Sequence, residues 1–150
     1  MKVVLQRSSF GSVEINKKIN GKCDKGYVLL VGFTNGDNEI IIDKMINKII
    51  NLRVFEDENG KLNKSILDIN GNVLSISQFT LYANCKEERR PSFTDALLYN
   101  EASKLYDIFN EKLSKFVDVQ TGVFGADMKV SILNDGPVTI VLDSKELFTT

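Results

Sequence analysis

Asn134-Asp135-Gly136-Pro137-Val138-Thr139 interrupts what otherwise reads as two successive strands near the end of this 150-residue chain. Apolar residues alternate with polar ones on both sides of this stretch, at Met128, Val130 and Ile132 before it and at Ile140 and Leu142 after it. Proline removes one backbone N–H from a sheet, so Pro137 marks a bend, an edge or a bulge. A Gly-Pro bond can also be cis, and its carbonyl oxygens stay free to accept hydrogen bonds. The pattern by itself predicts a hairpin turn.

The longest predicted strand, residues 73–82, carries a second segment of interest, Ser77-Gln78-Phe79-Thr80. In an extended strand the side chains of Gln78 and Thr80 lie on one face, and those of Ser77 and Phe79 lie on the other. Two hydrogen-bonding side chains beside each other at the end of a strand can line a small polar site. The alternative, which the pattern alone favours, is a half-exposed strand rich in β-forming residues.

Two helices and several shorter strands complete the predicted fold. Strands are predicted over residues 3–7, 12–15 and 27–31. A first helix begins at Asp37 or Asn38 and a second near Asn100, each with apolar side chains at helical spacing on one face. Because the helices lie between groups of strands, we expect an α/β protein with a mixed sheet and helices packed on one side. Since no repeat or linker divides the sequence, residues 1–150 are expected to form a single domain.

The composition narrows the chemistry, chiefly because the chain contains no histidine. An enzyme built from it must work with backbone dipoles, hydroxyls, shifted carboxylates or lysines, or groups on the substrate. Cys23 and Cys85 lack the spacing of a metal site or a disulfide framework, and no metal or cofactor is predicted. The net charge of −1 gives no global attraction to nucleic acid, so RNA binding needs a local basic patch. With neither a signal peptide nor an apolar run that could cross a bilayer, we expect a cytoplasmic protein without a membrane partner.

Two further segments have both a structural and a functional interpretation. The charged run after the long strand forms either a solvated loop or a set of contacts to phosphates through Lys86, Arg89 and Arg90. Phe124 is either a core aromatic residue or a platform on which a nucleobase stacks. The local patterns leave both alternatives open.

Several of these segments together resemble a known family, the D-aminoacyl-tRNA deacylases. Five blocks stand in the order and spacing of that family, namely Ser77-Gln78-Phe79-Thr80-Leu81, Arg90-Pro91-Ser92-Phe93, Gln120-Thr121-Gly122, Ala126-Asp127-Met128 and Asn134-Asp135-Gly136-Pro137-Val138-Thr139. Gln6-Arg7 and the stretch from Arg53 to Asn63 are similar too, so the resemblance covers nearly the whole chain. The family has an acidic residue, a threonine and then a glycine where this chain has Asn84, Cys85 and Glu88. That departure concerns the charged loop that carries Lys86, Arg89 and Arg90, called the basic loop below, rather than the core site.

The resemblance implies a fold, an activity and an assembly. Family members have a three-layer β/β/α fold, hydrolyse the ester between a D-amino acid and the 3′-terminal adenosine of tRNA, and act as homodimers with the site at the subunit interface. Mapped onto this sequence, Ser77-Gln78-Phe79-Thr80 forms the base of the pocket, and Gly136-Pro137, in the cis form, enters the pocket of the partner subunit. Phe124 and Met128 map to positions that hold the terminal adenine, and Arg7 maps to the support of the Gly-Pro loop.

The implied chemistry suits a chain without histidine. The backbone N–H of Phe79 or Thr80 is a candidate donor to the oxyanion, and the ribose 2′-hydroxyl of the substrate can orient or activate the attacking water. A competing mechanism makes Thr80 a covalent nucleophile, although nothing nearby in the sequence would deprotonate its hydroxyl. A rigid Gly-Pro wall is expected to exclude L-aminoacyl groups and to accept glycine. A general aminoacyl-ester hydrolase and a non-catalytic RNA-end binding module are the alternative hypotheses.

Overall fold

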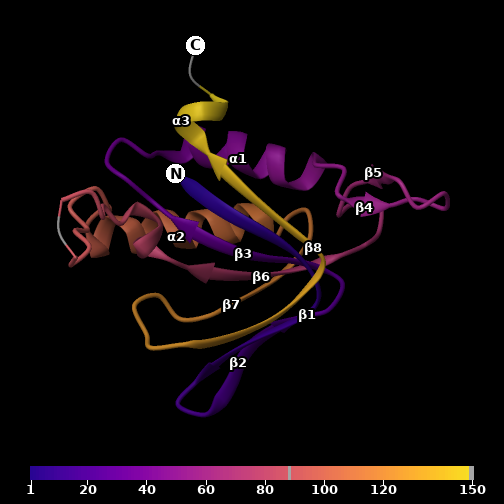
Figure 1. Ribbon diagram of the computed structural model, residues 1–150, viewed down its shortest axis with the longest axis horizontal. Coiled ribbons are helices and arrows are strands. Elements are labelled where there is room, and N and C mark those ends of the chain that lie inside the picture. The colour runs from indigo at the N-terminus through magenta and orange to yellow at the C-terminus, as the bar shows by residue number, and fades with distance from the viewer. Residues whose placement is uncertain (88, 149–150) are drawn as a thin grey trace.

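A computed structural model describes residues 1–87 and 89–148 (Figure 1), so Glu88, one of the departures from the family pattern, lies outside the described residues. The strands are β1 (Lys2–Ile15), β2 (Lys18–Cys23), β3 (Gly26–Gly32), β4 (Phe55–Glu56), β5 (Leu62–Lys64), β6 (Asn72–Ser77), β7 (Asp118–Thr121) and β8 (Lys129–Asp143). The helices are α1 (Glu39–Asn51), the 3₁₀ helix η1 (Phe79–Tyr82), α2 (Tyr99–Leu113) and α3 (Ser144–Leu147). Within the described ranges, none of these helices has the length and apolar character needed to span a membrane.

One mixed sheet organises the fold. Its strands lie in the order β2-β1-β3-β6-β7, and β8 pairs with β1 outside this path. β1 runs antiparallel to β2, β3 and β8, whereas β3, β6 and β7 are parallel to one another. The first half of β1 pairs with β3 and its second half pairs with β2, so this long strand connects two parts of a strongly curled sheet. β4 and β5 form a separate two-stranded sheet.

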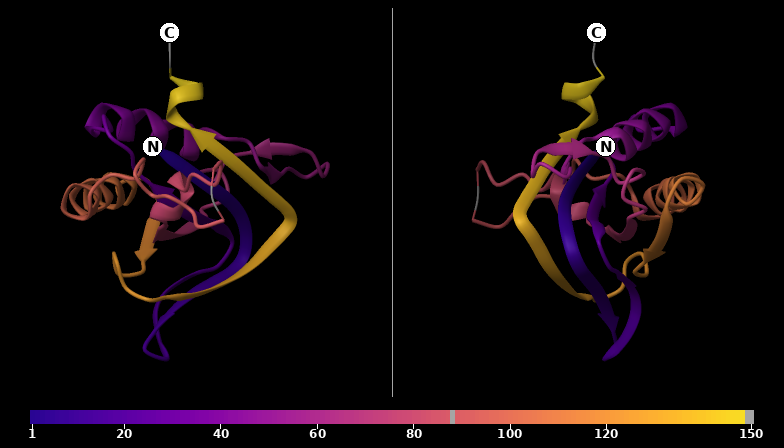
Figure 2. Two further views of the ribbon diagram at one scale, coloured as in Figure 1. Left: turned by 60° about the vertical axis from the view of Figure 1, so that its left-hand side comes forward. Right: turned by 90° about the vertical axis from the view of Figure 1, so that its right-hand side faces the viewer.

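Two hydrophobic cores lie on opposite faces of the central strands β3 and β6. The larger core contains Tyr27 and Leu29 of β3 together with the apolar faces of α1 and α2. The smaller core contains Val28 of β3 and Leu74 of β6 together with side chains of β1, β2 and β8. Because successive side chains of a strand point to opposite faces, β3 and β6 form the middle layer, with helices on one side and curled strands on the other (Figures 1 and 2). The expected α/β class with three β/β/α layers is confirmed.

The two long helices begin close to where their sequences predict. Asn38 is the N-cap of α1, and its side chain accepts a hydrogen bond from the backbone N–H of Ile41. α2 begins at Tyr99, one residue before the predicted start. The helices are tied to each other at the surface, where Lys112 Nζ of α2 lies 2.8 Å from Asp43 Oδ1 of α1.

The strand predicted over residues 73–82 ends at Ser77, and the rest of that prediction is wrong because the chain turns into η1. β6 pairs with β3 only as far as Val31 and Ser77, and β3 itself ends one residue later. The Gln78 N–H donates to the Val31 carbonyl at 2.7 Å, after which the Leu81 N–H donates back to the Gln78 carbonyl at 3.2 Å. Without a partner strand the chain leaves the extended conformation and turns at Gln78, so residues 77–80 do not alternate across two faces.

The hairpin predicted at Gly136-Pro137 is also wrong, because the two strands are one bent strand, β8. Both halves run antiparallel to β1, from the pair Glu14–Lys129 to the pair Lys2–Asp143. Their register with β1 shifts on both sides of Ser8, where the Gly-Pro stretch bends away. In the same way, the strands predicted over residues 3–7 and 12–15 are the single strand β1. The sequence pattern does not reveal β2 and β7, whose mostly polar residues show little alternation.

Candidate functional site

The carboxyl ends of the parallel strands β3, β6 and β7 meet at one edge of the sheet. The chain leaves β6 through Gln78 into η1, and it leaves β7 at Thr121 into the loop 122–128. The Gly122 N–H donates to the Ser75 carbonyl at 3.3 Å, so this loop starts beside the end of β6. Loops at the carboxyl ends of parallel strands are the usual ligand sites of open α/β sheets. Two segments singled out by the sequence, 77–80 and the loop with Phe124, therefore leave the sheet at a common edge.

η1 begins with two backbone N–H groups, those of Phe79 and Thr80, that have no acceptor in the described part of the chain. The first N–H groups of a helix lack intrahelical acceptors, so these donors are free to bind an oxygen from outside. Ser77 and Gln78 are half-buried, whereas Phe79 and Thr80 are exposed. Gln78 Nε2 donates to Thr80 Oγ1 at 2.5 Å. Because an amide is not a base, this contact orients the Thr80 hydroxyl without activating it.

Phe93 connects the basic loop to η1. Its ring makes a T-shaped contact with that of Phe79, and the two centroids are 5.1 Å apart. The loop between them is closed by the pairing of Asn84 with Ser92, with backbone hydrogen bonds of 2.7 and 2.9 Å. The cationic residues of this loop are all exposed, namely Lys86, Arg89 and Arg90. The loop that carries them is thus anchored next to η1.

Two tyrosines of α2 pack around Phe124 in the loop after β7. The ring centroids of Tyr99 and Tyr106 lie 5.0 and 5.7 Å from that of Phe124. Phe124 packs against the larger core, whereas Met128 packs against the smaller one. Both residues are half-buried. The two residues expected to hold an adenine therefore stand toward opposite ends of one loop, on different cores.

Tyr106 connects α2, β6 and this loop, a role that the sequence analysis missed. Its hydroxyl donates to the Ser75 carbonyl at 2.8 Å, the same carbonyl that accepts from Gly122. Burial raises the pKa of Tyr106, so the hydroxyl stays protonated and remains a donor. The available signal is the seven-residue spacing of Tyr99 and Tyr106 on α2, which core residues share.

β8 is sharply bent (Figure 2). Gly136 and Pro137 form an exposed corner of this strand where its register with β1 is broken, and the peptide bond between them is cis. Arg7, which is 7% exposed, holds this corner from β1. Its Nε donates to the Asp135 carbonyl at 2.9 Å, and its Nη1 donates to the Val54 carbonyl at 2.9 Å. Gly136 has a φ of +125°, and a Cβ there would lie 2.9 Å from Arg7 Nη2. Glycine is needed at this position both for its backbone conformation and for the close approach of the guanidinium.

Within one chain, this corner lies far from η1. Ser77 pairs with Val31, Val31 with Val3, and Val3 with Leu142, which follows Pro137 by five residues on β8. With about 4.8 Å between strands and about 3.3 Å per residue, Pro137 and Ser77 are roughly 20 Å apart along the sheet. The structure therefore does not bring the Gly-Pro corner and residues 77–80 together within one chain.

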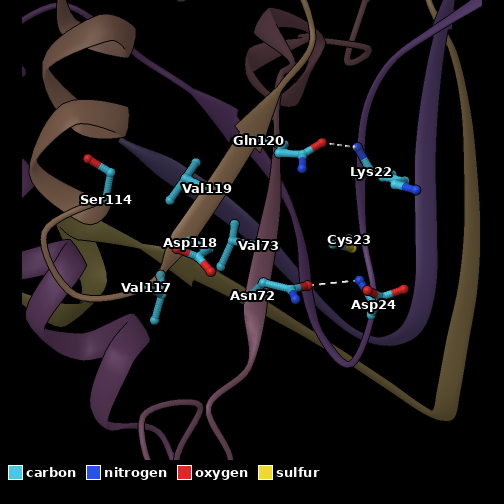
Figure 3. A pocket seen from close by; sticks show the side chains of 10 residues that line it. All are labelled: Lys22, Cys23, Asp24, Asn72, Val73, Ser114, Val117, Asp118, Val119 and Gln120. Carbon is cyan, nitrogen blue, oxygen red and sulfur yellow. Dashed lines mark hydrogen bonds between the residues drawn. The ribbon is translucent and has the colours of Figure 1, made fainter.

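A cavity of about 400 Å³ lies elsewhere, between β2 and the amino-terminal ends of β6 and β7 (Figure 3). It contains none of the predicted site residues, and its lining includes Cys23, Asn72 and Asp118. Burial raises the pKa of the Cys23 thiol. In the ranges that the structure describes, no three His, Cys, Asp or Glu side chains gather as a metal site would require. The free donors of η1, rather than this cavity, mark the candidate site.

The sequence matches a family model and a protein that are both named as deacylases of aminoacyl-tRNA. The family described as D-Tyr-tRNA(Tyr) deacylase matches residues 4–143. A protein of Sulfurihydrogenibium sp. (strain YO3AOP1) named D-aminoacyl-tRNA deacylase is 56% identical over 147 residues, which cover 98% of this chain and 100% of that protein.

Solved structures share the fold. One, described as a c-Myc DNA Unwinding Element Binding Protein, is 39% identical with a TM-score of 0.89, covering 95% of this chain and 98% of that chain. Another, described as a probable eukaryotic D-amino acid tRNA deacylase, is 16% identical with a TM-score of 0.82, covering 94% and 97%, and shows likeness of fold alone. Because the family match spans nearly the whole sequence and the Sulfurihydrogenibium relative is identical at more than half of the aligned positions, this chain belongs to the D-aminoacyl-tRNA deacylase family of hydrolases.

Proposed function

We propose that this protein hydrolyses the ester bond of D-aminoacyl-tRNA and releases the free D-amino acid and the tRNA. Its family supports the reaction. The observation that supports η1 as the site is the pair of backbone N–H groups at Phe79 and Thr80, which have no acceptor among the described residues. The protein acts in the cytoplasm as a single domain over residues 1–150, with aminoacyl-tRNA as its partner. The reaction needs no cofactor as proposed, because an aminoacyl ester is already an activated substrate.

The N–H groups of Phe79 and Thr80 stabilise the oxyanion that forms when water attacks the ester carbonyl. One such donor is worth about 10²–10³ in rate. The 2′-hydroxyl of the terminal ribose orients or activates the water, so no imidazole is required. Ser77 and Gln78 complete the base of the pocket, and the bond from Gln78 Nε2 keeps the Thr80 hydroxyl in place. Thr80 positions the substrate and does not attack it.

Gly136 and Pro137 exclude the L side chain from the pocket of a partner subunit. Discrimination of ~10⁴ requires about 5.5 kcal/mol between the two enantiomers, which steric exclusion supplies for every amino acid alike. The buried Arg7 limits movement of this wall through its bond to the Asp135 carbonyl. Glycine has no side chain to clash, so Gly-tRNA is a substrate too.

A homodimer through the outward face of β1 and β8 brings this corner to the partner's η1. Within one chain the corner and η1 are roughly 20 Å apart, so a second subunit has to supply it. Leu133 and Val141 flank the corner on β8 and expose 62% and 65% of their surfaces, and Phe10 of β1 pairs with Leu133. Large exposed apolar side chains clustered on one face are typical of an interface.

The end of the tRNA is held beside η1. Phe124 and Met128 hold the terminal adenine, and the cationic residues Lys86, Arg89 and Arg90 contact phosphates. Because phosphate contacts release counterions, binding of tRNA is expected to weaken with increasing salt.

Deacylation of D-Tyr-tRNA, L-Tyr-tRNA and Gly-tRNA by the purified protein tests the function. We expect hydrolysis of the D-Tyr and Gly substrates and protection of L-Tyr-tRNA by about 10⁴-fold. Equal hydrolysis of free D- and L-amino acid esters would instead indicate a general ester hydrolase. Salt-sensitive tRNA binding without deacylation would indicate a binding module.

The catalytic role of the substrate hydroxyl is tested with Thr80→Ala and with tRNA that ends in 2′-deoxyadenosine. We expect the variant to retain measurable kcat, because the backbone N–H at position 80 remains, and the deoxy substrate to be hydrolysed at least 10²-fold more slowly. An inactive variant combined with normal cleavage of the deoxy substrate would make Thr80 the nucleophile.

A further inference from the structure

Tyr99, the first residue of α2, presents an exposed aromatic ring beside Phe124. The planes of the two rings meet at 76°, and the Tyr99 hydroxyl donates to the Phe124 carbonyl at 3.3 Å. Tyr99 is 60% exposed, whereas Phe124 is half-buried. A large aromatic ring that is fixed by a neighbour and still open to solvent is a surface to which another planar group can bind.

Gly125 is the reason that Tyr99 can approach this loop so closely. A Cβ at position 125 would lie 2.6 Å from Cε2 and 2.9 Å from the hydroxyl of Tyr99. Gly125 also has a φ of +78°, a conformation that side chains rarely adopt. The ring of Tyr99 is therefore held close to the loop at Cε2 and the hydroxyl, and 60% of the residue stays exposed.

We propose that Tyr99 is a second nucleobase platform, which stacks the unpaired nucleotide that precedes the terminal adenosine of the tRNA. The inference rests on the proposed function, in which Phe124 holds the terminal adenine. Two aromatic rings at nearly right angles receive two successive bases only if those bases are unstacked from each other. Bases at single-stranded RNA ends are recognised in that state, splayed out and stacked on aromatic side chains.

The groups on the loops at this edge of the sheet favour an RNA strand over other occupants. Phe93 and Phe79 form a second, partly exposed T-shaped pair at the base of the basic loop. Lys86, Arg89 and Arg90 are exposed on that loop. Aromatic faces interleaved with cationic groups fit the stacked bases and the phosphates of a single strand.

The test compares a substrate that has the preceding nucleotide with one that lacks it. D-Tyr-tRNA and D-tyrosyl-adenosine are hydrolysed by wild type, Tyr99→Leu, Tyr99→Phe and the neighbouring control Leu98→Ala. We expect Tyr99→Leu to raise the ratio of KM for the tRNA to KM for the adenosine ester about tenfold, the size of one lost stacking contact. Tyr99→Phe keeps the ring and its T-shaped contact with Phe124 and loses only the 3.3 Å hydroxyl bond. Leu98 is not part of the platform, so both variants keep a ratio close to that of the wild type.

Three outcomes for Tyr99→Leu would overturn the inference. An equal rise of both KM values would mean that Tyr99 only supports Phe124, and two unchanged KM values would mean that no base stacks on Tyr99. A change in the molecular mass of the protein in solution would make Tyr99 a contact between subunits. Equilibrium binding of adenosine and of the uncharged dinucleotide cytidylyl-adenosine gives the same ratio without turnover. If the wild type binds adenosine and cytidylyl-adenosine but hydrolyses neither D-Tyr-tRNA nor D-tyrosyl-adenosine, the proposed function is wrong. The ratio of the two binding constants still tests the role of Tyr99 in that case.

Discussion

At the residue scale, the side chain of Asn134 forms hydrogen bonds that span the Gly-Pro corner. Its Oδ1 accepts from the Val138 N–H at 3.0 Å, and its Nδ2 donates to Thr139 Oγ1 at 2.8 Å. Gln6 of β1 donates to the same hydroxyl at 3.3 Å. Because Pro137 has no N–H and the register with β1 is broken here, these side-chain bonds replace the missing backbone ladder.

We predict that Asn134→Ala relaxes the discrimination between D- and L-aminoacyl-tRNA. The variant loses about 1 kcal/mol of hydrogen bonding at the corner, so Gly136 and Pro137 can move away from an L side chain. Hydrolysis of L-Tyr-tRNA therefore rises five- to tenfold relative to D-Tyr-tRNA. Rates on both substrates and the melting temperature measure the effect, with the exposed Ser131→Ala on the same strand as the control. A lower melting temperature with an unchanged D/L ratio would limit Asn134 to a structural role.

At the scale of elements, the sheet closes between its edge strands β2 and β7 through side chains rather than a backbone ladder. The side-chain amide of Asn20 donates to the Thr121 carbonyl at 2.9 Å. The amide oxygens of Gln120 and Asn72 accept from the Lys22 N–H and the Asp24 N–H, each at 2.8 Å (Figure 3). Edge strands leave such groups unpaired, and each bond removes that cost at one position.

We predict that Gln120→Ala loosens this seam while Gln120→Glu leaves it closed. The alanine variant loses the acceptor for the Lys22 N–H, so its free energy of unfolding falls by about 1 kcal/mol and exchange of that amide becomes faster. The glutamate variant keeps an oxygen at the same position. Chemical denaturation and amide hydrogen exchange measure both effects, and equal exchange of Lys22 in the two variants would contradict this assignment.

At the scale of the whole molecule, the cores bury groups that can lose a proton only at high pH. Burial raises the pKa of Cys23 above its ordinary value of 9.0 and the pKa of both Tyr27 and Tyr82 above 10.0. The folded chain therefore keeps these protons while the unfolded chain releases them. Since the folded state binds more protons in that range, the free energy of unfolding falls as the pH rises above about 9.

We predict that Tyr27→Phe reduces this alkaline loss of stability. Between pH 8 and pH 10.5, ionisation of Tyr27 in the unfolded chain costs about 1 kcal/mol, which the phenylalanine variant does not lose. Urea denaturation at the two pH values measures the difference. Each protein serves as its own reference at pH 8, where the variant lacks only the weak 3.4 Å bond from the Tyr27 hydroxyl to the Ile49 carbonyl. The same loss in both proteins would show that Tyr27 does not contribute.

The parts of the fold that depend on neighbours in the sequence could be predicted. Asn38 caps its helix through a side chain that reaches three residues ahead, and the apolar faces of α1 and α2 follow from helical spacing. The end of β6 at Ser77 and the continuity of β8 through Pro137 could not be predicted in the same way. Both depend on where β3 and β1 offer a partner, and those strands lie far away along the chain.

The sequence by itself determined that the chain has no histidine, that segments 77–80 and 134–139 are unusual, and that helices lie between groups of strands. Only the tertiary structure decided that two backbone donors of η1 have no acceptor among the described residues, that Tyr99 and Tyr106 pack around Phe124, and that the Gly-Pro corner lies away from η1. The physical reason is the distance along the chain between the residues that interact. Caps and apolar faces act over a few residues, whereas strand pairing and ring packing join residues that folding alone brings together.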